Sequence, residues 1–224
     1  MIVYTAIFGD IDRLWSANTN GVKHIAFVDS QKEECDLISG RPTNFPVWEQ
    51  RVIIPNWDNR RTARHFKTMP HLYMPDADTW IWVDCNVRLM DTPQNIVDKY
   101  LQSGFATFKH PDRDCVYDEA EICARVNKDK PEILGPQVAR YYKEGMPKHW
   151  GLAETRVVLR TNNEINNTLD SMWWDEIRTH SLRDQVSLPY VFWKMGLKWS
   201  IIPGRCGPIH PVGPFKYMRH NGRN

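Results

Sequence analysis

Residues 79–90, with the sequence TWIWVDCNVRLM, constrain the fold of this chain more than any other stretch. A run so rich in β-branched and aromatic residues predicts a strand buried on both faces, as in the centre of a parallel sheet. Asp84 and Asn86 are two positions apart in this run, so on an extended chain they point the same way, and Cys85 points into the packing. A buried carboxylate needs a partner, which at a strand end is a cation or a polar ligand. The pair predicts a metal and phosphate site, or a cap on the helix expected near residues 91–93.

Length and composition limit the possible classes of protein. A chain of 224 residues fits one α/β domain that buries about 70% of its unfolded surface. A net charge of +2 is too small to indicate nucleic-acid binding, and ten Trp residues suit either a core or a sugar-binding surface. The five cysteines lack a Cys-x-x-Cys pair, which predicts a reduced, cytoplasmic protein. Because a strand pattern begins at residue 2 and no apolar run approaches 20 residues, we expect neither a signal peptide nor a membrane span.

Strand and helix patterns alternate along the chain, which predicts a mostly parallel central sheet flanked by helices. Besides 79–90, the expected strands are 2–8, 23–28, 47–55, 104–108, 151–160 and 198–203. The expected helices are 59–67, 93–103, 116–126, 132–144, 163–179 and 181–195. The tail, residues 204–224, is rich in Gly, Pro, His and Arg, and we expect no regular structure in it.

The helix expected at 59–67 has the strongest charge pattern in the chain. Asn59 is a good N-cap, and Arg60, Arg64 and Lys67 follow at positions that share one helical face. Like charges stacked in this way repel each other unless an anion lies opposite, and a diphosphate would suit them. The alternative is a solvated basic face.

Further polar residues follow the predicted strands. Asp10 and Asp29 come after the first two strands, where they could contact a nucleoside or form turns. His110 begins a dense polar loop, and Glu154 opens the strand at 151–160, which would face the same crevice in a mixed sheet.

Taken in order, these motifs resemble GT-A glycosyltransferases. The chain is similar both to the family 8 retaining enzymes and to a glycosyltransferase-like domain family known mainly from plants and bacteria. The resemblance covers about residues 2–203 and lies in VYTAIFG (3–9), FVD (27–29), residues 64–75, WIWVD (80–84), HP (110–111), YDEA (117–120) and DQ (184–185). It implies one Rossmann-like GT-A domain at 1–203, with 204–224 as a strap that completes the donor site.

The resemblance also implies a metal site and a catalytic pair. Asp84 and Asn86 match the Asp-x-Asp motif that holds Mn²⁺ or Mg²⁺, with an amide in place of the second acid. The family 8 enzymes have a late His-x-x-Gly-x-x-Lys strap with a metal ligand and a phosphate-binding lysine, which His210, Gly213 and Lys216 match. Their Asp-Gln pair beside the anomeric carbon is matched by Asp184 and Gln185.

The implied reaction moves a hexose from a nucleotide diphosphate sugar, expected to be a UDP-sugar, to an acceptor hydroxyl with retention. Phe8, in the first motif, is expected at the donor nucleotide, while His110 and Glu154 are expected at the sugar or acceptor. The acceptor itself, whether glycan, lipid or DNA base, cannot be read from the motifs. Three alternatives stay open: transfer to a hydroxymethylated base in DNA, a non-catalytic nucleotide-sugar binding module, and a Trp-rich scaffold that binds a protein partner.

Overall fold

The computed structural model describes residues 1–10, 12–17, 19–36, 41–205 and 214–218. Seven strands from this part of the chain form one sheet in the order β10-β8-β9-β6-β1-β3-β5. Their bounds are Ile2–Ile7 (β1), Lys23–Val28 (β3), Trp48–Val52 (β5), Thr79–Val83 (β6), Phe105–Lys109 (β8), Ala153–Thr161 (β9) and Ser200–Ile202 (β10). The sheet is mostly parallel, because among these strands β9 alone runs antiparallel to its neighbours, β6 and β8.

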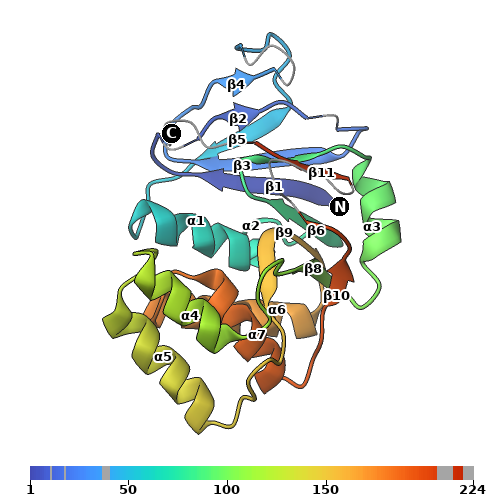
Figure 1. The fold of residues 1–224 in the computed structure, drawn as a ribbon. Helices are drawn as coiled ribbons and strands as arrows, with labels where there is room; N and C mark the ends of the chain where they lie inside the picture. Colours follow the sequence, from blue (N-terminus) through green and yellow to red (C-terminus); the bar gives the residue numbers. More distant parts are fainter. Residues whose placement is uncertain (11, 18, 37–40, 206–213, 219–224) are drawn as a thin grey trace.

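Helices cover both faces of the sheet (Figure 1). Those of the described residues are Asn59–Thr68 (α1), Pro70–Tyr73 (α2), Pro93–Tyr100 (α3), Val116–Arg125 (α4), Pro131–Lys143 (α5), Glu164–Thr179 (α6) and Asp184–Lys194 (α7). On one face α1 packs against β1 and α7 against β9, while α4 packs against both α7 and α5. On the other face α3 lies beside β10. The predicted α/β architecture is confirmed.

Strand β6 is buried on both faces, as the apolar run at 79–90 predicts. Trp80 and Trp82 pack in the core cluster on the side of α1 and α7, whereas Ile81 and Val83 pack in the cluster on the side of α3. Each of these four side chains is at most 2% exposed. Ligands reach a buried parallel strand only at its carboxyl end. Residues that bind a ligand must therefore come directly after the strand.

The order of strands reverses beside β1. The chain continues from β1 to β3 and β5 on one side and later places β6 on the other side. The crossover connections therefore diverge at the carboxyl ends of β1 and β6, which opens a crevice there. Gly9, directly after β1, has a φ of +80° and lies against the start of α1, so the chain turns away without blocking the crevice.

Several local expectations are wrong. The strand expected at 79–90 breaks at a turn, after which β7 (Val87–Leu89) pairs antiparallel with β11 (Phe215–Tyr217). The tail therefore does form regular structure at β11. Two further strands, β2 (Leu14–Trp15) and β4 (Glu34–Cys35), form a small parallel pair. The N-cap of α1 is Asp58 rather than Asn59, because the Asp58 carboxylate accepts the Arg61 backbone N–H.

None of the helices in the described ranges is both long and apolar enough to cross a bilayer.

Candidate functional site

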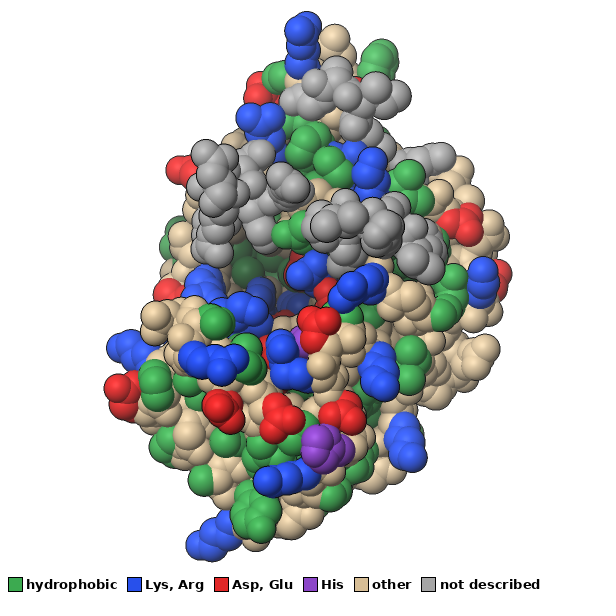
Figure 2. Space-filling model, viewed as in Figure 1, with side chains coloured by type: hydrophobic (Ala, Val, Ile, Leu, Met, Phe, Trp, Pro, Cys, Tyr) green, Lys and Arg blue, Asp and Glu red, His purple; other side chains and the backbone are tan. Residues whose placement is uncertain are grey.

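A cavity of about 770 Å³ lies at the crevice between β1 and β6. Its walls come from the ends of β1, β6 and β8, the strand β9, helix α1 and the start of α7. Most of its lining side chains are polar or charged, and Figure 2 shows Lys and Arg gathered around the hollow on this face. A cavity of this volume and charge suits a polar small molecule of the size of a nucleotide.

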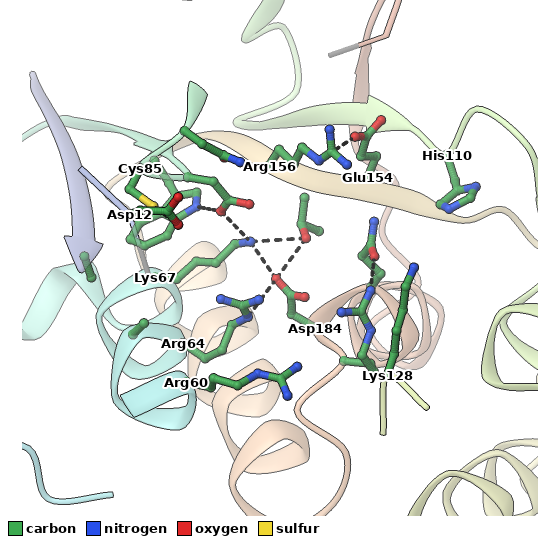
Figure 3. A pocket seen from close by; sticks show the side chains of 18 of the residues that line it. Asp12, Arg60, Arg64, Lys67, Cys85, His110, Lys128, Glu154, Arg156 and Asp184 are labelled. Atoms are coloured by element: carbon green, nitrogen blue, oxygen red, sulfur yellow. Dashed lines mark hydrogen bonds and ion pairs between the residues drawn. The ribbon is translucent and has the colours of Figure 1, made fainter. Parts of the chain in front are cut away.

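Helix α1 directs a row of cations into the cavity. Arg60, Arg64 and Lys67 all line it, as their helical spacing predicts, and they point the same way in Figure 3. Lys67 is only 1% exposed. Its Nζ lies 2.5 Å from Asp184 Oδ2 and 3.5 Å from Asp84 Oδ1, so two carboxylates from distant parts of the chain hold it in place.

Asp184, the first residue of α7, is the centre of this ion network. Its carboxylate accepts from Lys67, lies 3.4 Å from Arg64 Nε, and accepts the Thr155 hydroxyl at 2.9 Å. Burial alone would raise the pKa of Asp184, but Arg64 and Lys67 outweigh burial and lower the pKa well below its usual range. With this lowered pKa, Asp184 is an anion at neutral pH that orients the cations of α1, and it is 3% exposed.

A second buried network supports Lys67 from behind. The Tyr4 hydroxyl donates to the Lys67 carbonyl at 2.8 Å, and the Arg160 guanidinium donates to the same carbonyl and to Tyr4. Arg160 is also paired with Asp170, and both are fully buried. Local sequence patterns did not reveal this support, because its members lie on β1, α1, β9 and α6.

Asp84 and Asn86 both line the cavity, although they occupy a turn rather than an extended strand. The Val87 N–H donates to the Asp84 carbonyl at 2.7 Å, which closes the turn. Asp84 Oδ1 accepts the Trp82 indole N–H at 2.8 Å. The alternative that Asp84 caps the next helix is wrong, since Thr92 caps α3.

The oxygen donors of Asp84 and Asn86 are of the kind that Mn²⁺ and Mg²⁺ prefer. The described residues bring three His, Cys, Asp or Glu ligand atoms together at one place, formed by Cys115, Asp118 and His149, and these do not line the cavity. Among the described residues, the side-chain oxygens of Asp84 and Asn86 thus suit a divalent ion at the cavity. Two ligands do not complete its coordination, so the substrate or other residues would supply the rest.

A β-bulge in β9 places three consecutive side chains in the cavity. Thr107 pairs with Val158 and the next residue of β8 pairs with Glu154, so residues 155–157 have no partner on β8. The Thr107 hydroxyl lies 2.9 Å from the Glu154 carbonyl and 2.7 Å from the Val157 carbonyl. It can donate its hydrogen bond to either of these two carbonyls. Because the bulge interrupts the normal alternation, residues 154, 155 and 156 all line the cavity.

Glu154 and His110 lie in the cavity wall and are 4% and 8% exposed. Arg156 Nε lies 3.0 Å from Glu154 Oε1, whereas Oε2 is buried with no hydrogen-bond partner among the described residues. Burial raises the pKa of Glu154 and the charge of Asp84 adds to the rise, against the opposing effect of Arg156. His110 Nδ1 accepts the Arg113 N–H at 3.2 Å, and burial lowers its pKa.

Other residues expected at the site have different outcomes. Phe8 and Gln185 line the cavity. Asp10 and Asp29 do not line it, and Asp29 instead accepts the Gly9 N–H at 2.6 Å and pairs with Lys32. Lys216 is exposed on β11 and also does not line the cavity. His210 and Gly213 lie outside the described residues.

Sequence reasoning missed several lining residues, among them Arg113, Lys128, Arg156 and Arg183. Arg183 precedes Asp184, so its position beside a candidate residue was a usable signal. Arg156 comes two positions after Glu154 and would share its face in a regular strand, so this spacing was also a usable signal. Asp12 Oδ2 accepts from the Cys85 thiol at 3.1 Å, a contact that depends on the tertiary fold.

Two curated relatives match the chain, both from Arabidopsis thaliana. The probable hexosyltransferase MUCI70 is 28% identical over 170 residues, which are 69% of this chain and 29% of that protein. The alkaline ceramidase TOD1 is 24% identical over 221 residues, which are 85% of this chain and 48% of that protein. The chain therefore spans less than half the length of either relative.

Similar solved structures include the apo form of the bifunctional glycosyltransferase WbbM, at a TM-score of 0.49 and 8% identity over 90% of this chain and 38% of that one. Another is a glycosyltransferase involved in glycosylation of the major capsid of PBCV-1, at a TM-score of 0.31 and 10% identity over 58% and 50% of the two chains. The family model described as TOD1/MUCI70, glycosyltransferase-like domain, matches residues 1–202. The chain thus belongs to the TOD1/MUCI70 family of glycosyltransferase-like domains.

Proposed function

We propose that this domain transfers a hexose from a nucleotide diphosphate sugar, specifically a UDP-sugar, to an acceptor hydroxyl with retention. The observation that carries the proposal is the ion network at the end of β1 and β6, where Lys67 and Arg64 are held in place by Asp184. Family membership and the hexosyltransferase relative support the same reaction class.

The cations of α1 have a clear part in this reaction. Breaking the bond between the sugar and the diphosphate leaves negative charge on the phosphate oxygens. Lys67 and Arg64 would face that charge from fixed positions, because Asp184 and Thr155 already orient the Lys67 ammonium. Side chains that are oriented before the reaction need little reorganisation when the charge develops.

A divalent ion, Mn²⁺ or Mg²⁺, would be held by Asp84 and Asn86 in this proposal. Such an ion would supply further positive charge to the diphosphate. His210, Gly213 and Lys216 belong to the proposal as a strap over the donor. Lys67 lies 3.5 Å from Asp84 Oδ1, so its ammonium would contribute to the same charge balance.

The remaining cavity residues divide between nucleoside, sugar and acceptor. Phe8, which lines the cavity, would contact the nucleoside in this proposal, and Asp10 and Asp29 are retained as more distant nucleoside candidates. Glu154 and His110 would contact the sugar or the incoming hydroxyl, with Gln185 beside Asp184 near the anomeric carbon. The departing phosphate would take the proton of the acceptor, which gives retention when attack occurs on the face that it leaves.

Hydrolysis of a ceramide, suggested by the name of the second relative, is less well supported. A ceramide carries long apolar chains, whereas the lining of this cavity is mostly polar and charged. A non-catalytic nucleotide-sugar module would share the donor site and would differ only in turnover.

Thermal-shift and calorimetric titration with UDP, GDP and their hexose conjugates tests the proposal, each with and without Mn²⁺. We expect selective, Mn²⁺-dependent binding of UDP and its sugars, lost in Asp84→Ala and kept in Asp76→Ala, which removes an exposed carboxylate outside the cavity. Saturation at 100 times Kd should add about 2.7 kcal/mol of stability. Slow UDP-sugar hydrolysis should accompany binding, and NMR of the first anomer released tests retention. If no nucleotide raises the melting temperature, the proposal is contradicted. Binding of nucleotide sugars without turnover would instead support the non-catalytic nucleotide-sugar module.

A further inference from the structure

Three side chains with metal-binding atoms meet outside the main cavity. Cys115 precedes α4, Asp118 lies in the first turn of that helix, and His149 belongs to the segment that leads into β9. The Cys115 thiol, a carboxylate oxygen of Asp118 and a ring nitrogen of His149 all lie within 4.8 Å of one another. These three residues do not line the cavity. They therefore form a second place on this chain where a cation could bind.

Neither Cys115 nor Asp118 serves the helix that carries it. Cys115 is the N-cap of α4, but its side chain accepts no backbone N–H of the first turn. The thiol is free and 1% exposed, and it has no hydrogen-bond partner in the part of the chain that the structure describes. Asp118 is exposed and makes no hydrogen bond or ion pair with the described residues. Both side chains are thus available as ligands.

The backbone and a neighbouring carboxylate place His149 beside α4. Its φ is +57°, which turns the chain sharply, and the Gly151 N–H donates to the Asp114 carbonyl at 3.0 Å. The Asp114 carboxylate lies 2.7 Å from His149 Nδ1. A metal-bound histidine commonly donates its other ring N–H to a carboxylate, which orients the ring. Asp114 is placed for that role, and Nε2 then keeps a lone pair for a metal.

The mixture of ligand types indicates Zn²⁺. A thiolate and an imidazole favour zinc, whereas Mg²⁺ and Mn²⁺ prefer oxygen ligands. Tetrahedral zinc with bonds of about 2.0–2.3 Å holds its ligand atoms about 3.5 Å apart. Atoms that lie within 4.8 Å must therefore close by at most about 1.3 Å, which rotation of the exposed Asp118 and His149 side chains allows. A water molecule would take the fourth position.

A metal at this place would join two segments that carry cavity residues. His110, which lines the cavity, comes shortly before Cys115, and Glu154, which also lines it, comes shortly after His149. The two segments already meet through the backbone, because the His110 N–H donates to the Leu152 carbonyl at 2.8 Å. A bound ion would add a link through side chains.

We propose that Cys115, Asp118 and His149 bind one Zn²⁺ ion, which fixes the loop between β8 and α4 to the segment before β9. The Cys115 thiol gives up its proton to solvent when it binds the ion. This site is separate from Asp84 and Asn86, and its ion has a structural role. The inference therefore does not depend on the nucleotide-sugar chemistry.

Cobalt substitution in the full chain tests the ligand set. Bound Co²⁺ should give a thiolate charge-transfer band and the visible bands of a tetrahedral ion, and Zn²⁺ should displace it. Cys115→Ser should lose the thiolate band. Asp118→Asn and His149→Gln change exposed side chains, and each should weaken Co²⁺ binding at least about tenfold. Cys123→Ser, a matched change of another buried thiol on α4, should keep both the band and the affinity.

Hydrogen exchange followed by mass spectrometry measures whether the ion joins the two segments. Zn²⁺ should slow exchange of the backbone amides at 148–152 in wild type and leave it unchanged in His149→Gln. A thiolate band that persists in Cys115→Ser would overturn the site, as would unchanged Co²⁺ affinity in both Asp118→Asn and His149→Gln. Zinc binding without slower exchange at 148–152 would overturn the link between the segments.

UDP titration with Mn²⁺ keeps this test apart from that of the proposed function. Cys115→Ser and His149→Gln, checked for folding by circular dichroism, should bind UDP as wild type does. Failure of wild type to bind UDP would contradict the nucleotide-sugar proposal alone, because the zinc site is measured without a nucleotide. Loss of UDP binding in both folded variants would overturn a separate zinc site, by assigning these residues to the donor site.

Discussion

Replacement of Lys67 by Met tests whether the buried ion network holds the site together. The substitution keeps an unbranched, apolar side chain as far as Cε and removes the ammonium between Asp184 and Asp84. Asp184 would remain as a buried anion that is 3% exposed. Its remaining partners would be Arg64 at 3.4 Å and the Thr155 hydroxyl at 2.9 Å.

The expected loss of unfolding free energy depends on the partners that Asp184 retains in Lys67→Met. Removal of one member of a buried ion pair costs about 3–5 kcal/mol, because the other charge stays desolvated. Arg64 and Thr155 still contact the carboxylate, so we expect the lower end, a loss of about 3 kcal/mol. The double variant Lys67→Met/Asp184→Leu removes both charges together. Its loss should fall short of the sum of the two single losses by about 2 kcal/mol, within the range measured for contacting residues.

Equilibrium urea unfolding at pH 7, monitored by Trp fluorescence, measures these free energies for the four proteins of the cycle. UDP binding measured on the folded variants separates the stability effect from the site effect, and we expect affinity to fall in Lys67→Met. A loss below about 1 kcal/mol in Lys67→Met, or strict additivity in the double variant, would refute the reasoning. In that case Lys67 and Asp184 would not be coupled in solution.

Three other perturbations test separate parts of the site. Asp184 has a lowered pKa in the folded state, so its ionised form stabilises the protein at pH values above its unfolded pKa of about 3.9. This stabilisation is lost as the pH falls below that value. The difference in unfolding free energy between wild type and Asp184→Asn should therefore shrink below about pH 4. Thr107→Val should cost about 1–3 kcal/mol and reduce turnover, since the bulge carbonyls lose their donor, whereas Thr107→Ser should behave nearly as wild type in both assays. Gly9→Ala should destabilise more than Gly21→Ala in thermal unfolding, because both have φ near +80° but only at Gly9 would a Cβ meet Asn59, at 2.8 Å. Equal losses at the two glycines would show that the contact with Asn59 is unimportant.

Much of the fold could be predicted from local patterns. The apolar run at 79–90 implies a central strand, and β6 is indeed buried on both faces. The helical spacing of Arg60, Arg64 and Lys67 implies one basic face, and all three line the cavity. Hydrophobic periodicity and local composition depend on a few neighbouring residues, so they can be recognised without knowledge of the rest of the chain.

Local errors occurred where tertiary contacts decide the backbone. The residues after Asp84 turn, because β7 pairs with β11 near the end of the described chain. A three-residue strand such as β11 is stabilised by its partner and has little preference of its own. From its position after a strand, Asp29 was expected to bind a ligand. In the structure its carboxylate instead accepts the Gly9 N–H and forms an ion pair with Lys32.

The sequence by itself determined which residues could carry charge into a crevice and roughly where the strands end. Only the tertiary structure decided which charges meet. Lys67 and Asp184 are 117 positions apart, and their 2.5 Å contact depends on the order of strands and on the packing of α1 against β1 and of α7 against β9. The bulge that brings Thr155 into the same cavity as Glu154 and Arg156 is likewise a property of the β8 and β9 pairing. Long-range pairing of this kind leaves no periodic trace in the sequence, because it depends on how distant segments are brought together by folding.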